Sequence, residues 1–456
     1  MTTQEEMEKP AEMQPAARVR NPLHAIAWWQ HDIRHMMSAR VRETRLGFRK
    51  TWYLGALTLG CFTIQIATGL LLMLYYHPSI PQAYADMKDL EFVVSSGGML
   101  RSLHRWSAHA MVFLVFVHMA KVFYRRAYQA PRELNWMVGV SLLLTALMLS
   151  YTGYLLPWDQ LSYWGTTVGA SIMSSVPFFG AKLRFYLLGG HTVNANALLR
   201  FYVLHTMVFP LVIISLVSVH FWRLHKDGGM FELDEAGKPI IPHDVPEQDN
   251  PLLGAENEKT LSYRELLFRE IIAIEALAVV LFSVALIWKA PLEELASPLH
   301  TPNPAKAPWY FTGLQELLHY FPPFVAGIIL PALIVSGLFV IPFVPFFDIV
   351  TTADMCSWVR GKSARTITIA SILIVLSALL IRIHAWDAML PLWIIVAILC
   401  LTSRAVGPQN RFGNWVRSRS LSFWIMTLFL MEAVVLTSVG TLFRGPSWSW
   451  IWPWRG

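Results

Sequence analysis

Long apolar stretches separated by short polar loops run through most of this chain. A helix needs roughly 20 apolar residues to cross the hydrocarbon core of a bilayer. Several stretches approach or exceed that length, so the pattern predicts membrane-spanning helices. The expected segments are 52–76, 103–124, 137–156, 200–224, 265–288, 324–347, 366–384, 386–402 and 420–442.

One long polar stretch, residues 226–262, divides these segments into two groups. Over residues 24–47, Trp, Ile and Met mix with Arg and His, which favours an amphipathic helix on the membrane surface. The expected fold is an all-α polytopic membrane protein of about eight to nine transmembrane helices: a four-helix bundle, then a C-terminal helical membrane domain. The expected units are 1–50 (cytoplasmic tail and surface helix), 51–225 (four-helix domain), 226–262 (linker), 263–350 (C-terminal domain) and 351–456 (additional transmembrane helices).

Composition agrees with a membrane protein, since 55% of the residues are hydrophobic and 15% are charged. The net charge of +7 does not indicate a nucleic-acid partner, because Lys and Arg gather in alternate loops and form no single basic face. By the positive-inside rule, the N-terminus and the basic loops are cytoplasmic, as in a multi-pass protein of a bacterial inner membrane. The three cysteines form no CxxC pair, which excludes a disulfide framework.

Four histidines lie at matching intervals in two apolar segments. His104 and His118 are fourteen residues apart, and His205 and His220 are fifteen apart. At about 1.5 Å and 100° per residue, each pair spans about 21–22 Å and stays on nearly one face. Ionisable groups in lipid are costly and usually functional. The pattern predicts two bis-imidazole haem sites, with His104 and His205 near the outer face and His118 and His220 near the inner face.

Glycines repeat this interval on two neighbouring segments. Gly55 and Gly69 are fourteen residues apart, as are Gly139 and Gly153. A flat macrocycle between helices needs residues without side chains where the backbone approaches it. Small residues also serve ordinary helix packing. Repetition at the histidine interval favours the haem interpretation.

Basic residues lie near both ends of the histidine segments. Arg101, Arg105 and Arg200 are at the outer end and Lys121 is at the inner end, where they could neutralise haem propionates. The alternative for each is snorkelling to the interface. His109 is five residues from His104, about 140° round the helix, so we expect it to be an ordinary packing residue.

The stretches LRSLHRWSAHAMVFLVFVH, PRELNWMVGV, TGYLLPWDQLSYWG and LRFYVLHTMVFPLVIISLVSVH resemble cytochrome b of the quinol-oxidising bc and bf complexes. The fifteen-residue histidine interval and the PWDQ motif resemble the chloroplast-type branch, here with both halves on one chain. The similarity covers residues 50–225 and, more weakly, continues to about 350.

This resemblance implies the cytochrome b subunit of a quinol:cytochrome c oxidoreductase. Such a subunit oxidises quinol at the outer face and passes electrons through two haem b groups to an inner quinone site, coupled to proton translocation. The implied partners are a Rieske iron–sulfur protein, a cytochrome c or c-type subunit, membrane lipid and a second copy in a homodimer, with no nucleic acid.

The resemblance also implies an outer quinol pocket. Its residues would be Pro157, Trp158, Asp159, Tyr163, Gly165, Pro308, Trp309 and Tyr310. The family's second motif is Pro-Glu-Trp-Tyr, whose Glu accepts a quinol proton, but this chain has Ala307-Pro308-Trp309-Tyr310. A carboxylate within reach of the quinol is still needed. Asp159, Glu294 or Glu316 would have to substitute, and the sequence does not choose among them.

Cys61, in LGCFTIQIATG, falls where the resemblance implies a single cysteine that attaches a third, c-type haem through one thioether near the inner haem. Arg132 matches a basic residue near that cofactor. The alternative is an inert, buried cysteine. Lys121 stands where the family usually has Arg.

Two other functions remain open. A di-haem membrane anchor could relay electrons between quinone and a dehydrogenase without bifurcation, although a relay needs only one quinone pocket. A transporter that uses intramembrane acids such as Glu275 and Glu432 explains neither the paired histidines nor the glycines.

Overall fold

The computed structural model describes residues 40–42, 51–226, 260–344, 393–394 and 410–454. These residues are helical or lie in short connections, apart from a three-residue antiparallel ladder between β1 (Arg40–Arg42) and β2 (Thr260–Ser262). The expected all-α fold is confirmed. At β1 the structure corrects the helix expected over 24–47. The rest of that segment, the segment 366–384 and nearly all of 386–402 lie outside the described residues.

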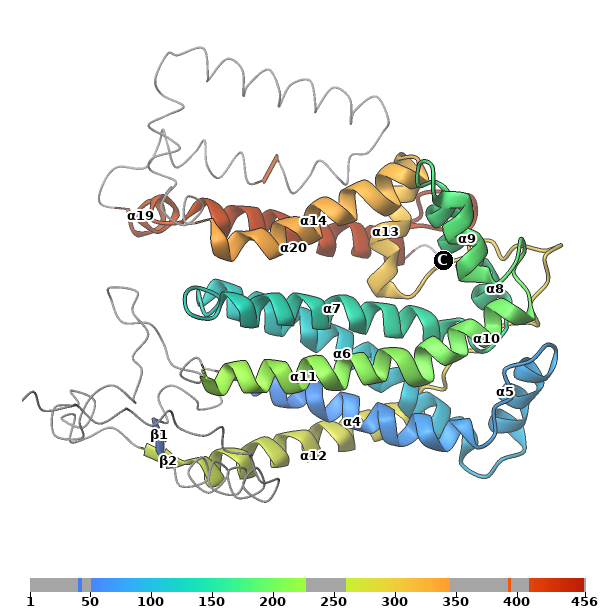
Figure 1. Cartoon of the computed structure of the whole chain (residues 1–456), viewed down its shortest axis with the longest axis horizontal. Helices are drawn as coiled ribbons and strands as arrows, with labels where there is room; N and C mark the ends of the chain where they lie inside the picture. Colours follow the sequence, from blue (N-terminus) through green and yellow to red (C-terminus); the bar gives the residue numbers. More distant parts are fainter. Residues whose placement is uncertain (1–39, 43–50, 227–259, 345–392, 395–409, 455–456) are drawn as a thin grey trace, which may run out of the picture.

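Seven helical stretches of the described residues are long and apolar enough to cross a membrane. They coincide with seven of the nine expected segments, and Figure 1 shows them running side by side. They are Leu54–Met73, Gly97–Tyr124, Glu133–Tyr154, Ala195–Leu224, Tyr263–Ile287, Val325–Phe343 and Leu421–Phe443.

The first four of these stretches form the bundle that carries the histidines. Their helices are α4 (Leu54–Met73), α6 (Gly97–Tyr124), α7 (Glu133–Tyr154), α10 (Ala195–Val203) and α11 (Phe209–Lys226). The largest contacts are between α4 and α6 and between α7 and α11, so the bundle is built from two helix pairs.

Three short helices cover one end of this bundle: α5 (Gln82–Phe92), α8 (Gln160–Ser174) and α9 (Gly180–Leu188). We call it the outer end, following the orientation expected from the charged loops. These three helices were not predicted from the sequence, because their mixed composition lacks a long apolar run. Asp159 starts α8, and its carboxylate accepts hydrogen bonds from the Ser162 backbone N–H and hydroxyl at 2.9 and 2.7 Å.

The second half of the chain lies on two sides of the bundle. The helix α12 (Tyr263–Ile287) packs against α4 and α6, whereas α14 (Leu330–Val340) lies beside α7. The connection after α12 crosses the outer end to reach α13 (Trp309–Tyr320). The chain therefore brings the second predicted pocket motif, at the start of α13, to the end of the bundle that carries the first.

The helix α20 (Leu421–Ser438) packs along α13 and continues into a wide turn at Val439–Phe443. A fully buried ion pair joins the two segments: the Arg444 guanidinium donates to the Glu316 carboxylate, with Nε 3.0 and 3.1 Å from the two oxygens. The Trp448 indole N–H also donates to Glu316, at 2.8 Å. The C-terminal segment is thus fastened to the helix that begins with the Trp309–Tyr310 motif.

A π-helical turn, Leu204–Val208, interrupts the fourth span between α10 and α11. Pro210 has no backbone N–H to donate to residue 206, so an ordinary helical ladder cannot continue there. Instead the N–H of Phe209 donates to the carbonyl of Leu204, five residues back. Such a turn accommodates one extra residue, and the helix is not lengthened by the full rise that a residue adds in an α-helix. This explains why His205 and His220 are fifteen residues apart while His104 and His118 are fourteen apart.

Candidate functional site

The outer pair of histidines faces across the bundle. The ring centres of His104 and His205 are 6.1 Å apart, with planes inclined by 75°. Two imidazoles that bind one metal from opposite sides, at about 2.0–2.1 Å each, hold their ring centres about 6 Å apart. The observed separation therefore fits a metal between them.

Hydrogen bonds determine which nitrogen of the His104 and His205 imidazoles carries no proton. The His205 Nδ1 lies 3.0 Å from the Leu149 carbonyl, which can only accept, so Nδ1 carries the proton. The Thr68 hydroxyl donates to the Ile64 carbonyl at 2.7 Å, and its oxygen is 2.9 Å from His104 Nδ1. That oxygen therefore accepts from Nδ1–H. Both imidazoles therefore have an unprotonated Nε2, which is the form that binds a metal. In each, the Nδ1–H is held by a hydrogen bond to a neighbouring protein oxygen.

Each of the four glycines lies opposite one histidine. A Cβ added at Gly55 would lie 3.6 Å from His118, and one at Gly139 would lie 3.8 Å from His220. At the outer level, a Cβ at Gly69 would lie 3.3 Å from His104, and one at Gly153 only 2.3 Å from His205. The structure thus brings the predicted residues together as two levels, each with two histidines and two glycines.

Cationic side chains near these levels have buried nitrogen atoms without a hydrogen-bond partner among the described residues. They include the Arg105 Nε at the outer level and the Lys121 Nζ at the inner level, as well as the Arg101 Nε. Arg105 and Lys121 each contact an aromatic ring: Arg105 lies 5.5 Å from the Tyr154 ring centre and Lys121 3.9 Å from that of Trp52. Both fit neighbours of an anionic group such as a haem carboxylate.

The other nitrogens of Arg101, and the other predicted cationic residues, have protein partners. Arg101 bonds Glu91 at 3.0 Å and the carbonyl of Pro291 at 3.2 Å, which ties α6 to the connection after α12. Burial alone would raise the pKa of Glu91, but hydrogen bonds from Arg101 and Lys289 hold it below its usual value. Arg200 donates to the carbonyl of Tyr186. Arg132 is buried just before α7.

Cys61 does not fit the covalent haem that the resemblance implied. Its side chain is fully buried in an apolar cluster at mid-bundle that includes Met111 and Leu149. It lies between Gly55 and Gly69 along α4, so it is not beside the inner level. A thioether would need the sulfur to face the cofactor, and close-packed side chains surround it instead. We derive no step through a third haem.

The outer ends of the two halves are hydrogen-bonded to each other. The backbone N–H of Glu293 donates to the Asp159 carboxylate at 3.1 Å, and that of Gln160 donates to the Glu294 carbonyl at 2.9 Å. Both Asp159 oxygens thus accept protein hydrogen bonds. Asp159 holds the connection after α12 in place, so it is less available to take a proton from a substrate.

The other predicted pocket residues surround this junction. Trp158 is buried and packs edge-on against Tyr163 at 6.2 Å. The carbonyl of Gly165 accepts from the Tyr151 hydroxyl at 3.3 Å. Pro157 precedes Trp158, and Pro308 is the N-cap residue of α13.

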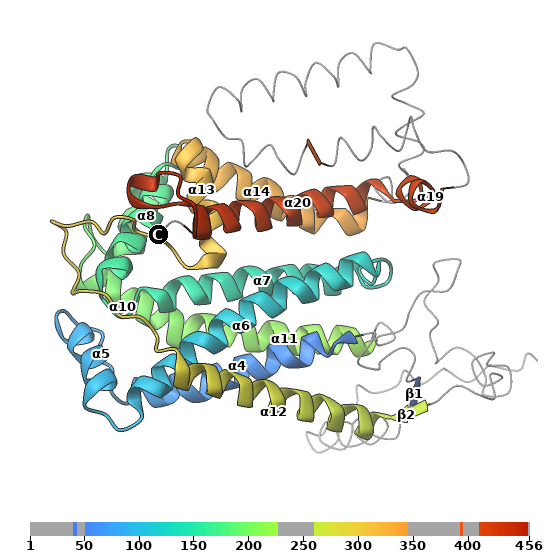
Figure 2. The same cartoon turned by 180° about the vertical axis from the view of Figure 1, so that it is seen from behind.

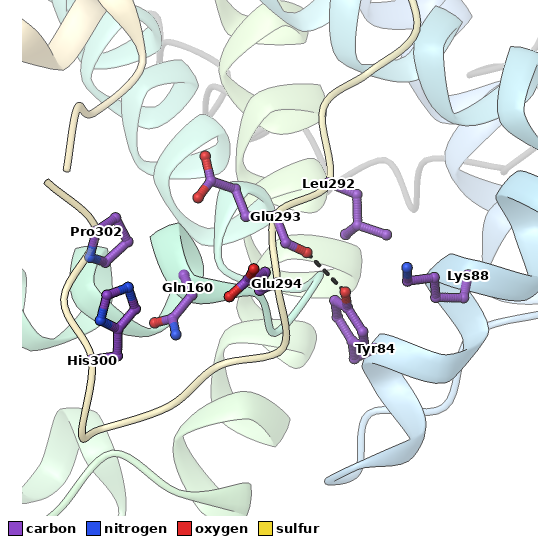
Figure 3. Close-up of a pocket in the computed structure, with 8 residues that line it drawn as sticks. All are labelled: Tyr84, Lys88, Gln160, Leu292, Glu293, Glu294, His300 and Pro302. Atoms are coloured by element: carbon purple, nitrogen blue, oxygen red, sulfur yellow. Dashed lines mark hydrogen bonds between the residues drawn. The ribbon is translucent and has the colours of Figure 1, made fainter. Parts of the chain in front are cut away.

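A cleft at this end, which we call the outer cleft, has a volume of about 410 Å³ (Figure 3). It is lined by Tyr84, Lys88, Gln160, Leu292, Glu293, Glu294, His300 and Pro302. Burial, followed by the nearby charges of Asp159 and Glu294, raises the pKa of Glu293. Glu294 was among the acids expected from the sequence and Glu293 was not, because no motif distinguishes these two neighbours. Glu316 lies elsewhere, in the buried ion pair with Arg444.

The Trp309–Tyr310 motif contacts the bundle directly. The Trp309 indole N–H donates to His109 Nδ1 at 3.1 Å, and the Tyr310 ring packs edge-on against His109 at 5.5 Å. Burial raises the pKa of Tyr310 to about 12, although the Arg105 charge acts in the opposite direction. His109, expected to be an ordinary packing residue, joins the two halves of the chain.

Comparison with known proteins identifies relatives of the bundle. Residues 43–228 match the family model described as cytochrome b/b6/petB. Cytochrome b6 of Heliobacterium mobile is 46% identical over 175 residues, which cover 38% of this chain and 82% of that protein. Cytochrome b6 of Synechocystis sp. is 40% identical over 175 residues, with 38% and 79% covered.

A solved structure is similar to nearly the whole chain. It is described as a hyperthermophilic respiratory Complex III, and it aligns with a TM-score of 0.60 at 23% identity. The alignment covers 91% of this chain and 97% of the other. At this identity the similarity concerns the fold, which extends beyond the bundle to the helices of the second half.

Proposed function

This chain belongs to the cytochrome b/b6 family, and from that premise we propose that it is the cytochrome b subunit of a quinol:cytochrome c oxidoreductase. It oxidises quinol at the outer face and reduces quinone at the inner face of a bacterial inner membrane, and it translocates protons. Its N-terminus is cytoplasmic. Its partners are a Rieske iron–sulfur protein and a c-type cytochrome, in a complex with two copies of this chain.

Family membership implies haem b, and the residues present fit it. The observation that carries the proposal is the set of four glycines, each opposite one of the four histidines. His104 and His205 would hold the iron at the outer level, and His118 and His220 at the inner level. Arg105 and Lys121 would face the haem carboxylates. When bound, the two haems supply a path for electrons across the bilayer.

We infer that quinol binds at the outer end, where the PWDQ and PWY segments meet. Oxidation to quinone releases two protons, so a base must lie near the substrate. Among the described acids there, Asp159 is held by hydrogen bonds and Glu316 by Arg444. The pair Glu293 and Glu294 borders the outer cleft instead (Figure 3), and the raised pKa of Glu293 suits it to accept a proton.

Alanine at Gly153 is expected to weaken haem binding at the outer level. Its Cβ would lie 2.3 Å from His205 Cε1, so the imidazole would have to move. Changes to the shell around a ligand typically reduce affinity by about 10- to 100-fold. We expect a lower haem content and a broadened α-band in the reduced spectrum. Gly337→Ala is the control, because nothing lies within 4 Å of its added Cβ; an equal effect there would contradict the assignment.

Glu294→Gln is expected to shift the acid limb of the pH profile of kcat/KM for quinol oxidation to lower pH. Glu293 must be deprotonated to accept a proton, and the negative charge of Glu294 contributes to its raised pKa. Removing that charge lowers the pKa of Glu293, so the base stays active in more acidic solution. The measurement is kcat/KM for quinol against pH. The exposed Glu265→Gln is the control, and an unchanged limb in Glu294→Gln would refute the role.

Quinol-driven reduction tests the function as a whole. The complex purified from membranes should show b-type α-bands on adding quinol, and should reduce a c-type cytochrome in a reaction that needs the Rieske protein. Reduction of the b haems without a Rieske partner would instead favour the relay between quinone and a dehydrogenase. Absence of haem would reject both.

A further inference from the structure

His109 connects two elements that are far apart in the sequence. It lies on α6, five residues after His104, and its Nδ1 is 3.1 Å from the indole nitrogen of Trp309 on α13. Its ring also packs against Trp106 at 5.3 Å and against Tyr310 at 5.5 Å. The histidine bundle and the PWY motif are thus joined by a hydrogen bond beside the outer level.

The direction of this hydrogen bond is determined by chemistry. An indole N–H can only donate, so Nδ1 must accept and the neutral ring carries its proton on Nε2. A leucine would fill similar space but would leave the half-buried indole N–H without its protein acceptor. The histidine therefore selects the orientation of Trp309 in addition to filling space.

Trp309 in turn contacts the tyrosine of the motif. The two rings are 5.3 Å apart and inclined by 82°, so a rotation of the indole displaces the phenol. Tyr310 also packs against His109 and lies near the charge of Arg105, both on α6. Its position thus depends on contacts from α6 and on its own neighbour.

We propose that His109 is a positioning residue of the outer quinol site: by accepting the Trp309 N–H it orients Trp309, and through it Tyr310, against the bundle. This inference rests on the proposed function, since it assigns the motif to quinol binding. His109 acts through Trp309 and takes no proton from the substrate.

A double-mutant cycle on the purified complex tests the inference. His109→Leu and Trp309→Phe should each lower kcat/KM for quinol about three- to tenfold, mainly through KM, as expected for one hydrogen bond. The double variant should lose no more than either single variant, because both remove the same bond. His109→Gln should restore most of the loss, since its amide oxygen can accept the indole N–H. His191→Leu, on an exposed ring outside the site, is the control.

The haem content should be the same in all these variants, which separates positioning from misfolding. Additive losses, or a glutamine variant as poor as the leucine variant, would overturn the inference. If the wild-type complex oxidises no quinol, the proposed function fails. The cycle is then measured on the Kd of a quinone analogue, from the shift of the haem band. If the effects of the His109 and Trp309 variants on this Kd are coupled, the positioning role is upheld. If the two effects are additive, or if the analogue does not bind, the positioning role is overturned.

Discussion

Replacing His205 by alanine is expected to remove about half of the haem b from the purified chain. His205 faces His104 at 6.1 Å, and its Nδ1–H is held by the Leu149 carbonyl, so only its Nε2 is free to bind iron. Alanine would leave only His104 to hold the iron at the outer level and would open a cavity beside Gly153. We expect quinol oxidation to be abolished while the inner level, built from His118 and His220, keeps its haem.

The measurement is the haem-to-protein ratio together with the reduced α-band. His77→Ala serves as the control, because this histidine is largely exposed and pairs with Asp86 away from both levels. It should keep the full haem content. If the His205 variant also kept full content and an unchanged spectrum, the two-level assignment would be wrong.

Arg444→Met should destabilise the protein by about 3–5 kcal/mol, because it leaves the Glu316 carboxylate buried without a counter-charge. The pair joins the C-terminal segment to α13, so loosening it should also disturb the nearby Trp309–Tyr310 motif. We expect a fall of several degrees in Tm in detergent. Quinol oxidation should fall, while the haem levels, which lie on other helices, remain loaded.

Two variants show whether the buried pair itself is responsible. Arg269→Met removes an exposed cation that pairs with Glu265 on the same helix, and its effect should be below about 1 kcal/mol. The double variant Glu316→Leu/Arg444→Met should recover part of the lost stability, because apolar residues can replace a buried ion pair. Equal Tm shifts for Arg444→Met and Arg269→Met would contradict the role of the buried pair.

The levels of the bundle could be read from the sequence because helical geometry is local. Intervals of fourteen residues keep two histidines or two glycines on nearly one face whatever the helix packs against, so the pairs His104 and His118, and Gly55 and Gly69, could be anticipated. The spans were equally accessible, since length and apolar composition decide them.

The outer pocket could not be read in the same way, because its contacts join distant segments. Asp159 had the chemistry of a base, but the structure uses both its oxygens to cap α8 and to hold the Glu293 backbone. Glu316 had the same chemistry, and its partner Arg444 lies 128 residues later. The angle of His109 relative to His104 predicted that the two histidines lie on different faces of the helix but carried no information about α13.

The wide turn at Leu204–Val208 changes how insertions and deletions in this chain should be understood. Since that turn absorbs one residue, the unequal histidine intervals describe equal depths in the bilayer and no difference in membrane thickness. Removing a residue between the turn and His220 would rotate that imidazole by about 100° away from Gly139. The same deletion in a surface loop would leave both histidine levels intact. Aligning relatives by residue count alone would therefore misplace either His205 or His220.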